Sequence, residues 1–464
     1  MSAPVSHNQA KFRLSQRAAY NSAQEQPWDA LEKMMANIWA SDNPDGLVFL
    51  GVAENTLLHQ EVATRINNNS AITPENHLGY GVGPRGSPRL RKALVSFLNS
   101  EFQASEPVLE KELLVLPGVV AVIDALTWSI CNDDEGIITP MPFYTGFKHA
   151  ISVGARGVLI PAPFQCVEGY NGLDDVFDPE MNRQALEKAL FQATQDGVKV
   201  RAVMISNPHN PLGRCYPEET IKEIARFCGR NNLHLISDEI FALSVYDNPQ
   251  AAAVTPFTSI LALDLKDCIE HYFVHVAYGI GKDFCATGLR LGMLHSRNEG
   301  LIAAVSSICV FGWVPYVTQD MWADILEDEQ FLADFKTKNR EVLAKHFTIL
   351  RSFLDRFNIP YYNNVHAGVF IWVDLRRYLH GESSHDAAPD HAELVPSMVD
   401  THRDREMKLF KRCLAAGVGI ALGSGFSTEE LGWFRISFAV EEQALIIGLQ
   451  RLIKCLESIE ANGW

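Results

Sequence analysis

The chain has 464 residues, of which 47% are hydrophobic, and its 40 basic and 56 acidic side chains give a formal net charge of −16. This length is enough for two substantial domains, each with its own hydrophobic core. The excess of negative charge argues against a nucleic acid or an anionic membrane surface as a partner, because both repel an acidic protein.

The nine cysteines are scattered along the chain and form no Cys-x-x-Cys pair. Most stand in apolar surroundings, as in Phe227-Cys228, which is typical of reduced thiols rather than of metal ligands or disulfides. The segment up to Trp28 has no apolar region of the signal-peptide kind, and no apolar run approaches the roughly 20 residues that span a bilayer. We therefore expect a cytoplasmic protein with no membrane partner and no metal.

The N-terminal quarter contains a polar arm and then a short strand. Residues up to about Glu25 show no pattern, which predicts an arm that is ordered only against another surface. A helix is predicted from Trp28 to Ile38. The apolar run Leu47 to Asn55 ends in two polar residues, which indicates a strand that carries Glu54 into a loop. Glu54 is either a functional carboxylate or a cap for the helix predicted at Leu57 to Ile66.

A glycine-rich loop, Gly79 to Ser87, leads into a helix predicted from Pro88 to Asn99. Such a loop suits close approach of the backbone to a ligand. It does not follow a convincing strand, so we do not interpret it as a dinucleotide-binding fingerprint.

From about Lys111 onward, short apolar runs alternate with amphipathic helices such as Pro217 to Asn231, the pattern of a mostly parallel sheet covered by helices on both faces. The seven predicted strands are Glu112–Leu116, Gly136–Thr139, Gly157–Ile160, Arg201–Ser206, Leu233–Ser237, His271–Ala277 and Arg290–His295. Ligand sites in such sheets lie beyond the carboxyl ends of the strands. The chemically suggestive residues at these ends are Pro117-Gly118, Phe143-Tyr144, Asn207 to Gly213, Asp238 and Lys282.

Beyond Trp313 the pattern predicts helices from Gln319 to Phe357, followed by a strand pair around Gly368–Asp374 and Trp433–Ala439. A polar insertion from about Gly381 to Asp400 is predicted to be a mobile surface loop. We therefore expect an α/β fold with three parts: an N-terminal arm and helix (1–45), a large domain around the seven-stranded sheet (46–312), and a smaller α+β domain (313–464).

Lys282 follows a predicted buried strand, and Arg290 comes eight residues later in a second apolar run. One interpretation is that Lys282 forms a Schiff base with an aldehyde cofactor while Arg290 binds the phosphate of that cofactor through a bidentate contact. The alternative is a surface lysine in a glycine turn with an arginine ion pair beyond it.

Two Asn-Pro pairs in tandem, in Asn207-Pro208-His209-Asn210-Pro211-Leu212-Gly213, are difficult to explain as ordinary turn chemistry. With Ser237-Asp238-Glu239-Ile240, Lys282, Arg290 and Trp433-Phe434-Arg435, the segment resembles pyridoxal-phosphate enzymes of fold type I, aminotransferase class I/II. Within that group the chain is most similar to the 1-aminocyclopropane-1-carboxylate synthase branch. The motifs that carry this resemblance are Gly51-Val52-Ala53-Glu54-Asn55, Pro142 to Phe147, Ala367 to Asp374 and Gly432 to Arg435. The resemblance runs from about Asp45 to Lys454.

The resemblance implies pyridoxal 5'-phosphate as the cofactor and assigns a role to each motif residue around its ring. Lys282 would hold the cofactor and take the proton from the substrate Cα. Asp238 would pair with the pyridine nitrogen, with an N-cap carboxylate as the alternative. Asn210 would donate to the phenolic oxygen of the ring, and Tyr144 would stack on its face.

The remaining implied roles concern the phosphate, the substrate and the partner subunit. Arg290 and the helix N-terminus at Val119, Val120 and Ala121 would receive the phosphate. Tyr80 resembles a tyrosine that the neighbouring subunit contributes to the phosphate or substrate, which implies a homodimer with shared sites. Arg435 would bind the α-carboxylate of an amino-acid substrate, with a strand-surface ion pair as the alternative.

Three departures from the family pattern concern contacts with the cofactor. Phe241 stands where the family usually has a tyrosine, so one donor to the phenolic oxygen is missing. Gly279 and Gly281 replace two serines, and Val119 or Val120 replaces a small hydroxyl residue at the phosphate. Weaker cofactor binding is expected unless backbone amides or Tyr80 compensate.

The retained Glu54 favours the synthase-like branch, in which the resemblance implies that this glutamate helps to control chemistry on the substrate side chain. The first hypothesis is therefore Cα deprotonation of an L-amino acid derivative, followed by elimination or substitution on its side chain, as in a carbon–sulfur lyase. The second is amino-group transfer to a 2-oxo acid, which uses the same residues. A third is a dimer that binds the cofactor without catalysis.

Overall fold

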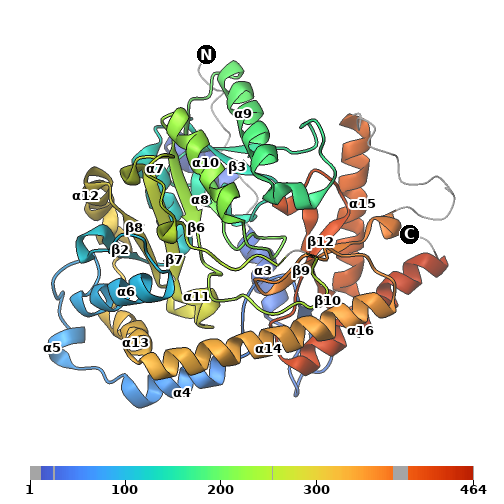
Figure 1. Ribbon diagram of the computed structural model, residues 1–464. Coiled ribbons are helices and arrows are strands. Elements are labelled where there is room, and N and C mark those ends of the chain that lie inside the picture. The colour runs from blue at the N-terminus through green and yellow to red at the C-terminus, as the bar shows by residue number, and fades with distance from the viewer. Residues whose placement is uncertain (1–11, 24–26, 253, 380–395, 463–464) are drawn as a thin grey trace.

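The computed structural model describes residues 12–23, 27–252, 254–379 and 396–462, and a seven-stranded sheet lies at its centre (Figure 1). The order of its strands is β2-β8-β7-β6-β5-β3-β4. Neighbours from β4 to β7 pair in parallel, whereas β8 runs antiparallel to both β7 and β2. The seven strands are β2 (Leu113–Leu116), β3 (Gly136–Pro140), β4 (Val158–Ala162), β5 (Val200–Ser206), β6 (His234–Asp238), β7 (Val274–Gly279) and β8 (Gly292–Ser296).

These strands confirm the predicted α/β class and its mostly parallel sheet of seven strands. Some predicted strands were given too early a start. Glu112 and His271 to Phe273 lie in short 3₁₀ helices before β2 and β7, and Arg290 and Leu291 precede β8 instead of opening it. Arg290 has a φ of 53°, in the left-handed region, where an extended strand cannot continue.

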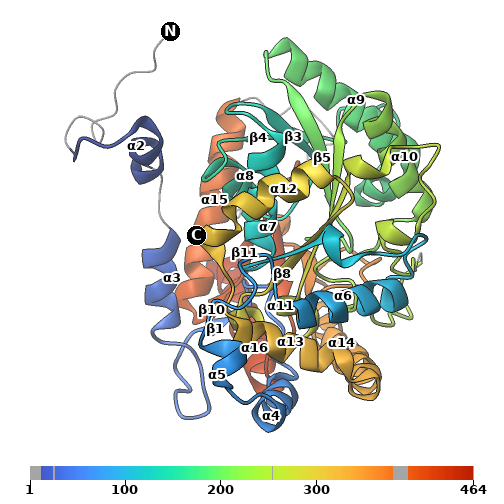
Figure 2. The same cartoon turned by 90° about the vertical axis from the view of Figure 1, so that its left-hand side faces the viewer.

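Alternating side chains along the strands divide the core between the two faces of the sheet. Ala202 and Met204 of β5 face one helical layer, and Val203 and Ile205 face the other. Helices α7 (Val119–Ile130), α8 (Gly146–Ser152) and α12 (Glu299–Ile308) pack on the first face. Helices α6 (Pro88–Glu101), α9 (Pro179–Gln195) and α10 (Glu218–Arg230) pack on the second. Figure 2 shows these layers on opposite sides of the strands.

Two smaller sheets lie in the C-terminal part of the chain. Strands β11 (Ala421–Leu422), β12 (Trp433–Ser437) and β9 (Phe370–Asp374) form an antiparallel sheet, so the predicted strand pair is present. Strand β1 (Val48–Phe49) pairs in parallel with β10 (Val418–Gly419). This pairing joins residues 48–49 to residues 418–419. The division into domains at residues 46 and 313 stays a proposal.

Nine further α-helices complete the described part of the chain. They are α2 (Gln16–Ala23), α3 (Pro27–Met35), α4 (His59–Asn69), α5 (Pro74–His77), α11 (Ile280–Asp283), α13 (Tyr316–Glu327), α14 (Glu329–Arg356), α15 (Pro396–Ala415) and α16 (Glu442–Asn462). The longest of them, α14, runs along one side of the molecule from α13 toward α16 (Figure 1). Its N-terminus is capped by Asp328, whose Oδ1 accepts a hydrogen bond from the backbone N–H of Phe331 at 2.9 Å.

Parts of two predictions lie outside the described residues. The predicted arm covers residues 1–11 and 24–26, which are not described, but its middle forms α2, where the Asn21 side chain donates to the Val153 carbonyl at 3.2 Å. Most of the predicted surface loop, 380–395, is likewise not described, and residues 396–400 begin α15 instead of continuing a loop.

Among the described residues, no single helix is both long and apolar enough to cross a membrane. One bent pair, Glu299–Gly312 with Tyr316–Glu327, meets that criterion only when its two halves are taken together across a bend of 119°.

Three glycines bring backbone directly against backbone where β7 and β8 meet the start of α7. A Cβ atom added to Gly279 would lie 2.6 Å from the carbonyl oxygen of Leu291. A Cβ on Gly292 would lie 2.6 Å from the carbonyl carbon of Gly118 and 2.8 Å from the nitrogen of Val119. No side chain fits at these contacts, so Gly279 and Gly292 hold the two strands against the N-terminus of α7.

We expect Gly279→Ala to lower the free energy of unfolding by about 1–3 kcal/mol, because the added methyl group must displace packed backbone. Gly281→Ala is the matched control, since its Cβ would meet nothing closer than 3.5 Å. Its stability should stay unchanged or rise by up to about 1 kcal/mol, as helical Gly→Ala changes do. Urea unfolding followed by circular dichroism measures both, and equal stability of the two variants would contradict the account.

Candidate active site

A cavity of about 370 Å³ opens at the carboxyl ends of the parallel strands. It is lined by almost all of the residues that the motifs single out: Val119, Val120, Tyr144, Asn210, Asp238, Lys282, Arg290 and Arg435. A larger cavity of about 710 Å³, bordered by Asp174, Tyr361 and Trp433, contains none of them and no lysine. The candidate active site is therefore the smaller cavity.

Two predicted residues do not line this cavity. Tyr80 is 83% exposed, and its ring packs against Trp313 with centroids 5.4 Å apart. Glu54 lies directly after Ala53, which is in the cavity wall, and its Oε1 accepts a hydrogen bond from Thr287 Oγ1 at 2.9 Å. The alternative interpretation of Glu54 as a helix cap was wrong, because α4 has Leu58 at its N-cap position and no side-chain cap.

Lys282 lies in the one-turn helix α11, directly after the end of β7. Burial lowers the pKa of its ammonium group to about 8, although the nearby carboxylates Glu54 and Asp238 act in the opposite direction. An amine with this pKa has a substantial neutral fraction at physiological pH, as a nucleophile or general base requires.

The helical turn of Lys282 is fixed by its neighbour Asp283, a fully buried carboxylate. Asp283 accepts hydrogen bonds from the Leu243 N–H at 2.9 Å, the Ser244 hydroxyl at 2.6 Å and the Tyr278 hydroxyl at 3.0 Å. Burial raises its pKa to about 7 despite these donors. These bonds join α11 to the loop that follows β6, so the backbone positions of Lys282 and Asp238 are coupled.

Asp238 ends β6 and is 4% exposed. Its Oδ1 accepts a hydrogen bond from the Ile240 N–H at 3.2 Å, and burial raises its pKa to about 7. Within the described residues this buried carboxylate has one weak donor, so it is well suited to accept an N–H from a ligand.

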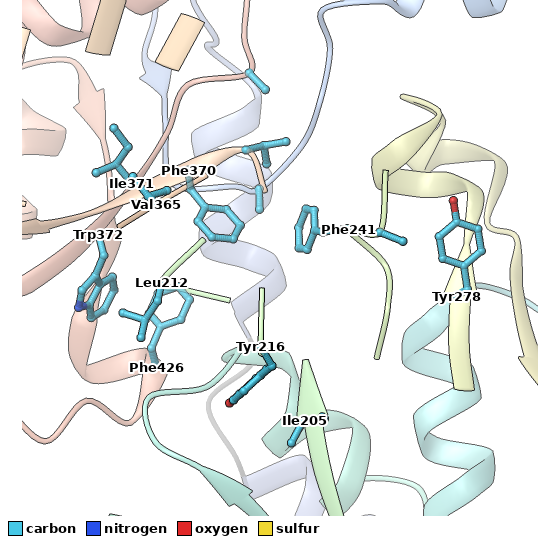
Figure 3. Close-up of a cluster of buried hydrophobic side chains, with 14 of the residues drawn as sticks. Ile205, Leu212, Tyr216, Phe241, Tyr278, Val365, Phe370, Ile371, Trp372 and Phe426 are labelled. Carbon is cyan, nitrogen blue, oxygen red and sulfur yellow. The ribbon is translucent and has the colours of Figure 1, made fainter. Parts of the chain in front are cut away.

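Phe241 closes the cavity beside Asp238 with an apolar ring. Its ring packs edge-on against Phe370 at 5.4 Å, and Figure 3 shows it between Phe370 and Tyr278. Phe370 in turn packs beneath the guanidinium group of Arg435, so the apolar cluster extends to that charged side chain.

Arg435, on β12, is a buried cation with spare donors. Its Nη1 donates to Asn210 Oδ1 at 2.9 Å and its Nη2 to the Gly51 carbonyl at 2.9 Å, while its Nε finds no partner among the residues that the structure describes. The guanidinium lies over the rings of Phe370 and Phe426, 4.9 and 4.7 Å from their centroids. Burial lowers its pKa to about 10. In the described part of the chain no carboxylate forms an ion pair with it, so the site favours an anionic ligand.

Asn210 is oriented by Arg435. Because its side-chain oxygen accepts from Arg435, its amide N–H₂ group remains available as a donor on the cavity side. Asn210 belongs to the tandem Asn-Pro segment, in which both Asn–Pro peptide bonds are cis.

Arg290 and the N-terminus of α7 form a cradle that suits a phosphate group. Arg290 is exposed and donates to the carbonyls of Thr287 and Pro117 at 3.0 and 3.3 Å. A Cβ on Gly118 would lie 2.6 Å from Arg290 Nη2, so only glycine leaves this space free. The N–H groups of Val119 and Val120 begin the helix and have no carbonyl partner within it. These donors fit the dianionic phosphate of pyridoxal phosphate.

The sequence interpretation assigned no role to Thr287, Asp283, Phe370 or Phe426, although Phe370 lies within the Ala367 to Asp374 motif. The position of Asp283 beside Lys282 was the only available signal for that residue. The partner of Thr287 lies 233 residues away in the chain, so no local pattern could reveal the bond.

Comparisons with known proteins agree with this geometry. The family model for aminotransferase class I and II matches residues 48–452. Over 436 residues the chain is 28% identical to 1-aminocyclopropane-1-carboxylate synthase 6 of Oryza sativa, covering 90% of this chain and 74% of that protein. It is also 28% identical over 435 residues to 1-aminocyclopropane-1-carboxylate synthase-like protein 1 of Homo sapiens, covering 92% and 81%. A solved structure of a double mutant of Thermus thermophilus aspartate aminotransferase has the same fold, with a TM-score of 0.68 and 21% identity over 95% and 99% of the two chains.

Replacement of Asp238 by asparagine should stabilise the cofactor-free protein at alkaline pH. The folded-state pKa of about 7 lies above the usual unfolded value near 3.9, so the ionised carboxylate opposes folding. The stability gain of Asp238→Asn should reach about 4 kcal/mol above pH 7 and should disappear as the pH falls from 7 to 4. Urea unfolding at several pH values measures it. The exposed Asp264→Asn serves as the control, and a gain independent of pH would contradict this account.

Proposed function

The chain belongs to the aminotransferase class I and II family and is a pyridoxal 5'-phosphate-dependent enzyme, and we propose that it acts on an L-amino acid by Cα deprotonation followed by elimination or substitution on the side chain. The observation that carries this proposal is the Glu54 carboxylate beside Lys282, held by Thr287. Simple amino-group transfer needs no carboxylate at this position. The names of the rice and human relatives, a synthase and a synthase-like protein, support the same choice.

Arg435 binds the substrate carboxylate in this proposal. A guanidinium group has five N–H donors, and two of those on Arg435 are already used by Asn210 and Gly51. The remaining donors can form a paired contact with a planar carboxylate. Phe370 and Phe426 exclude water from both faces of the guanidinium, which strengthens this contact.

Lys282 moves the proton. Its Nζ, once free of the cofactor, takes the proton from the substrate Cα, and burial keeps enough of the amine neutral for this step. Bound pyridoxal phosphate supplies an electron-withdrawing ring that makes the Cα proton acidic. The electron pair left at Cα then forms a new bond, either a Cα=Cβ double bond in elimination or a bond to the side-chain carbon at which displacement occurs in substitution, and the leaving group departs with the electrons of the bond that breaks.

The other residues of the cavity hold the cofactor in this proposal. Asp238 accepts the N–H of the ring nitrogen, and the amide of Asn210 donates to the phenolic oxygen. Tyr144 covers one face of the ring. Arg290 and the N–H groups of Val119 and Val120 bind the phosphate.

Amino-group transfer to a 2-oxo acid is the second candidate, and the match to the aminotransferase family model favours it. The two reactions share Lys282, Asp238 and Arg435. They differ in what happens after the Cα proton has been removed.

A panel of L-amino acids with leaving groups on the β or γ carbon distinguishes these candidates. We expect at least one to release ammonia, a 2-oxo acid or a thiol without an added 2-oxo acid acceptor. Glu54→Gln should slow this release about 10–100-fold, the usual size of a lost acid–base or electrostatic contribution. Lys282→Ala should abolish it. Stoichiometric conversion of the cofactor to its amine form, with no release, would instead identify an aminotransferase.

We further propose that the protein is a cytoplasmic homodimer whose partner contributes Tyr80 to the site. An apolar patch supports this: Leu78, Tyr80, Val82 and Phe311 are 73%, 83%, 69% and 87% exposed. The hydroxyl of Tyr316 joins the two segments by accepting from the Val82 N–H and donating to the Gly83 carbonyl. The patch adjoins the phosphate cradle, because a Cβ on Gly312 would touch Pro117, the residue before Gly118. Large exposed apolar patches of this kind mark protein interfaces.

Sedimentation velocity tests the dimer. Wild type should sediment as a dimer at micromolar concentration, and Phe311→Asp should shift it toward monomer and weaken cofactor binding about 10-fold or more, because a charge would be buried in the interface. Phe191→Asp is the matched control, since Phe191 is 66% exposed on α9. A wild-type monomer, or equal dimerisation of both variants, would contradict the proposal.

A further inference from the structure

Thr287 contacts three functional segments of the candidate active site. It begins a short 3₁₀ helix, Thr287–Leu289, and lines the cavity. Its backbone carbonyl accepts from Arg290 Nη1 at 3.0 Å. A Cβ atom added to Gly281 would lie 3.5 Å from the Cα of Thr287. Thr287 therefore packs against the turn that carries Lys282.

The hydroxyl of Thr287 has one short partner, which is Glu54. Oγ1 donates to Glu54 Oε1 at 2.9 Å, whereas the Gly281 carbonyl is 3.5 Å away, too far for a strong hydrogen bond. A bond within one loop would serve only local folding. This bond instead joins the loop after β1 to the segment between α11 and β8, which are far apart in the chain.

The contact matters because the charge of Glu54 raises the pKa of the Lys282 amine, against the effect of burial. Four charged groups influence that amine: the carboxylates of Glu54 and Asp238 favour its charged form, and the cations Arg435 and Arg290 disfavour it. Glu54 has the largest effect of the four. Asp238 is fixed at the end of β6, but Glu54 is on a loop and needs a partner to hold its carboxylate in place.

We propose that Thr287 is a positioning residue that fixes the carboxylate of Glu54 beside the amine of Lys282. The hydroxyl of Thr287 holds one carboxylate oxygen, and the other oxygen remains available to the amine or the substrate. The backbone carbonyl of the same residue holds Arg290, so a single residue aligns the phosphate-binding and substrate-facing sides of the cavity. This inference rests on the proposed function for the role of Glu54.

The test is the pH dependence of the visible absorbance of the bound cofactor in the full-length holoenzyme, which reports the proton at Lys282 Nζ. A nearby carboxylate favours the protonated form, so its loss lowers the midpoint. Thr287→Val keeps the shape and the backbone carbonyl but removes the hydroxyl, and we expect it to lower the midpoint by about 0.5–1 pH unit. Glu54→Gln should lower it at least as much, and the double variant should show no further shift.

Thr287→Ser is the matched control, because it keeps the hydroxyl and should keep the wild-type midpoint. Thr287→Ala provides a second variant without a hydroxyl if valine disturbs packing. A shift with Glu54→Gln but with neither Val nor Ala at position 287 would overturn the proposal, as would additive shifts in the double variant. No measurement here depends on turnover, so failure of the elimination assay and failure of this inference are separate results.

Discussion

The candidate active site depends on the contact of backbone with backbone at Gly118, Gly279 and Gly292. The contact sets the distance between the N-terminus of α7, which begins directly after Gly118, and the end of β7, after which Lys282 follows. Arg290 folds over Gly118 in the space that a side chain would occupy. The missing serine hydroxyl at position 279 is therefore a consequence of packing, because a serine Cβ would collide with the Leu291 carbonyl.

The charged groups of the cavity are held in an unfavourable environment. Burial lowers the pKa of Lys282 and of Arg435 and raises the pKa of Asp238, so in each case it favours the uncharged form. Each of these side chains also has few partners within the described chain. This arrangement costs stability in the empty protein. In the proposed function, the same lack of partners leaves Asp238, Arg435 and Lys282 free to bind a ring nitrogen, a carboxylate and an aldehyde, and the binding of these ligands would offset the cost to folding.

The sequence predicts the strands well because a buried parallel strand is a short apolar run, as at Arg201–Ser206. The order of the strands in the sheet could not be predicted, because it depends on contacts between distant segments. Motif residues such as Asp238 and Lys282 were found because the spacing around them resembles a known family, and both line one cavity. The partner of Glu54 was missed, because a side-chain hydrogen bond between Glu54 and Thr287 leaves no periodic pattern. The sequence interpretation assigned Arg290 to a strand because its neighbours are apolar, and an apolar run gives no sign of a left-handed backbone at one residue.

The parallel pairing of β1 with β10 has a consequence for how the protein is made. Gly51, Val52 and Ala53 form one wall of the cavity and directly follow β1, whose partner Val418 is synthesised some 370 residues later. Arg435 comes later still. A nascent chain can form much of the central sheet on the ribosome, but it cannot close this cavity until Val418 and Arg435 have both emerged. A ligand that needs the complete cavity therefore cannot bind before that stage of synthesis.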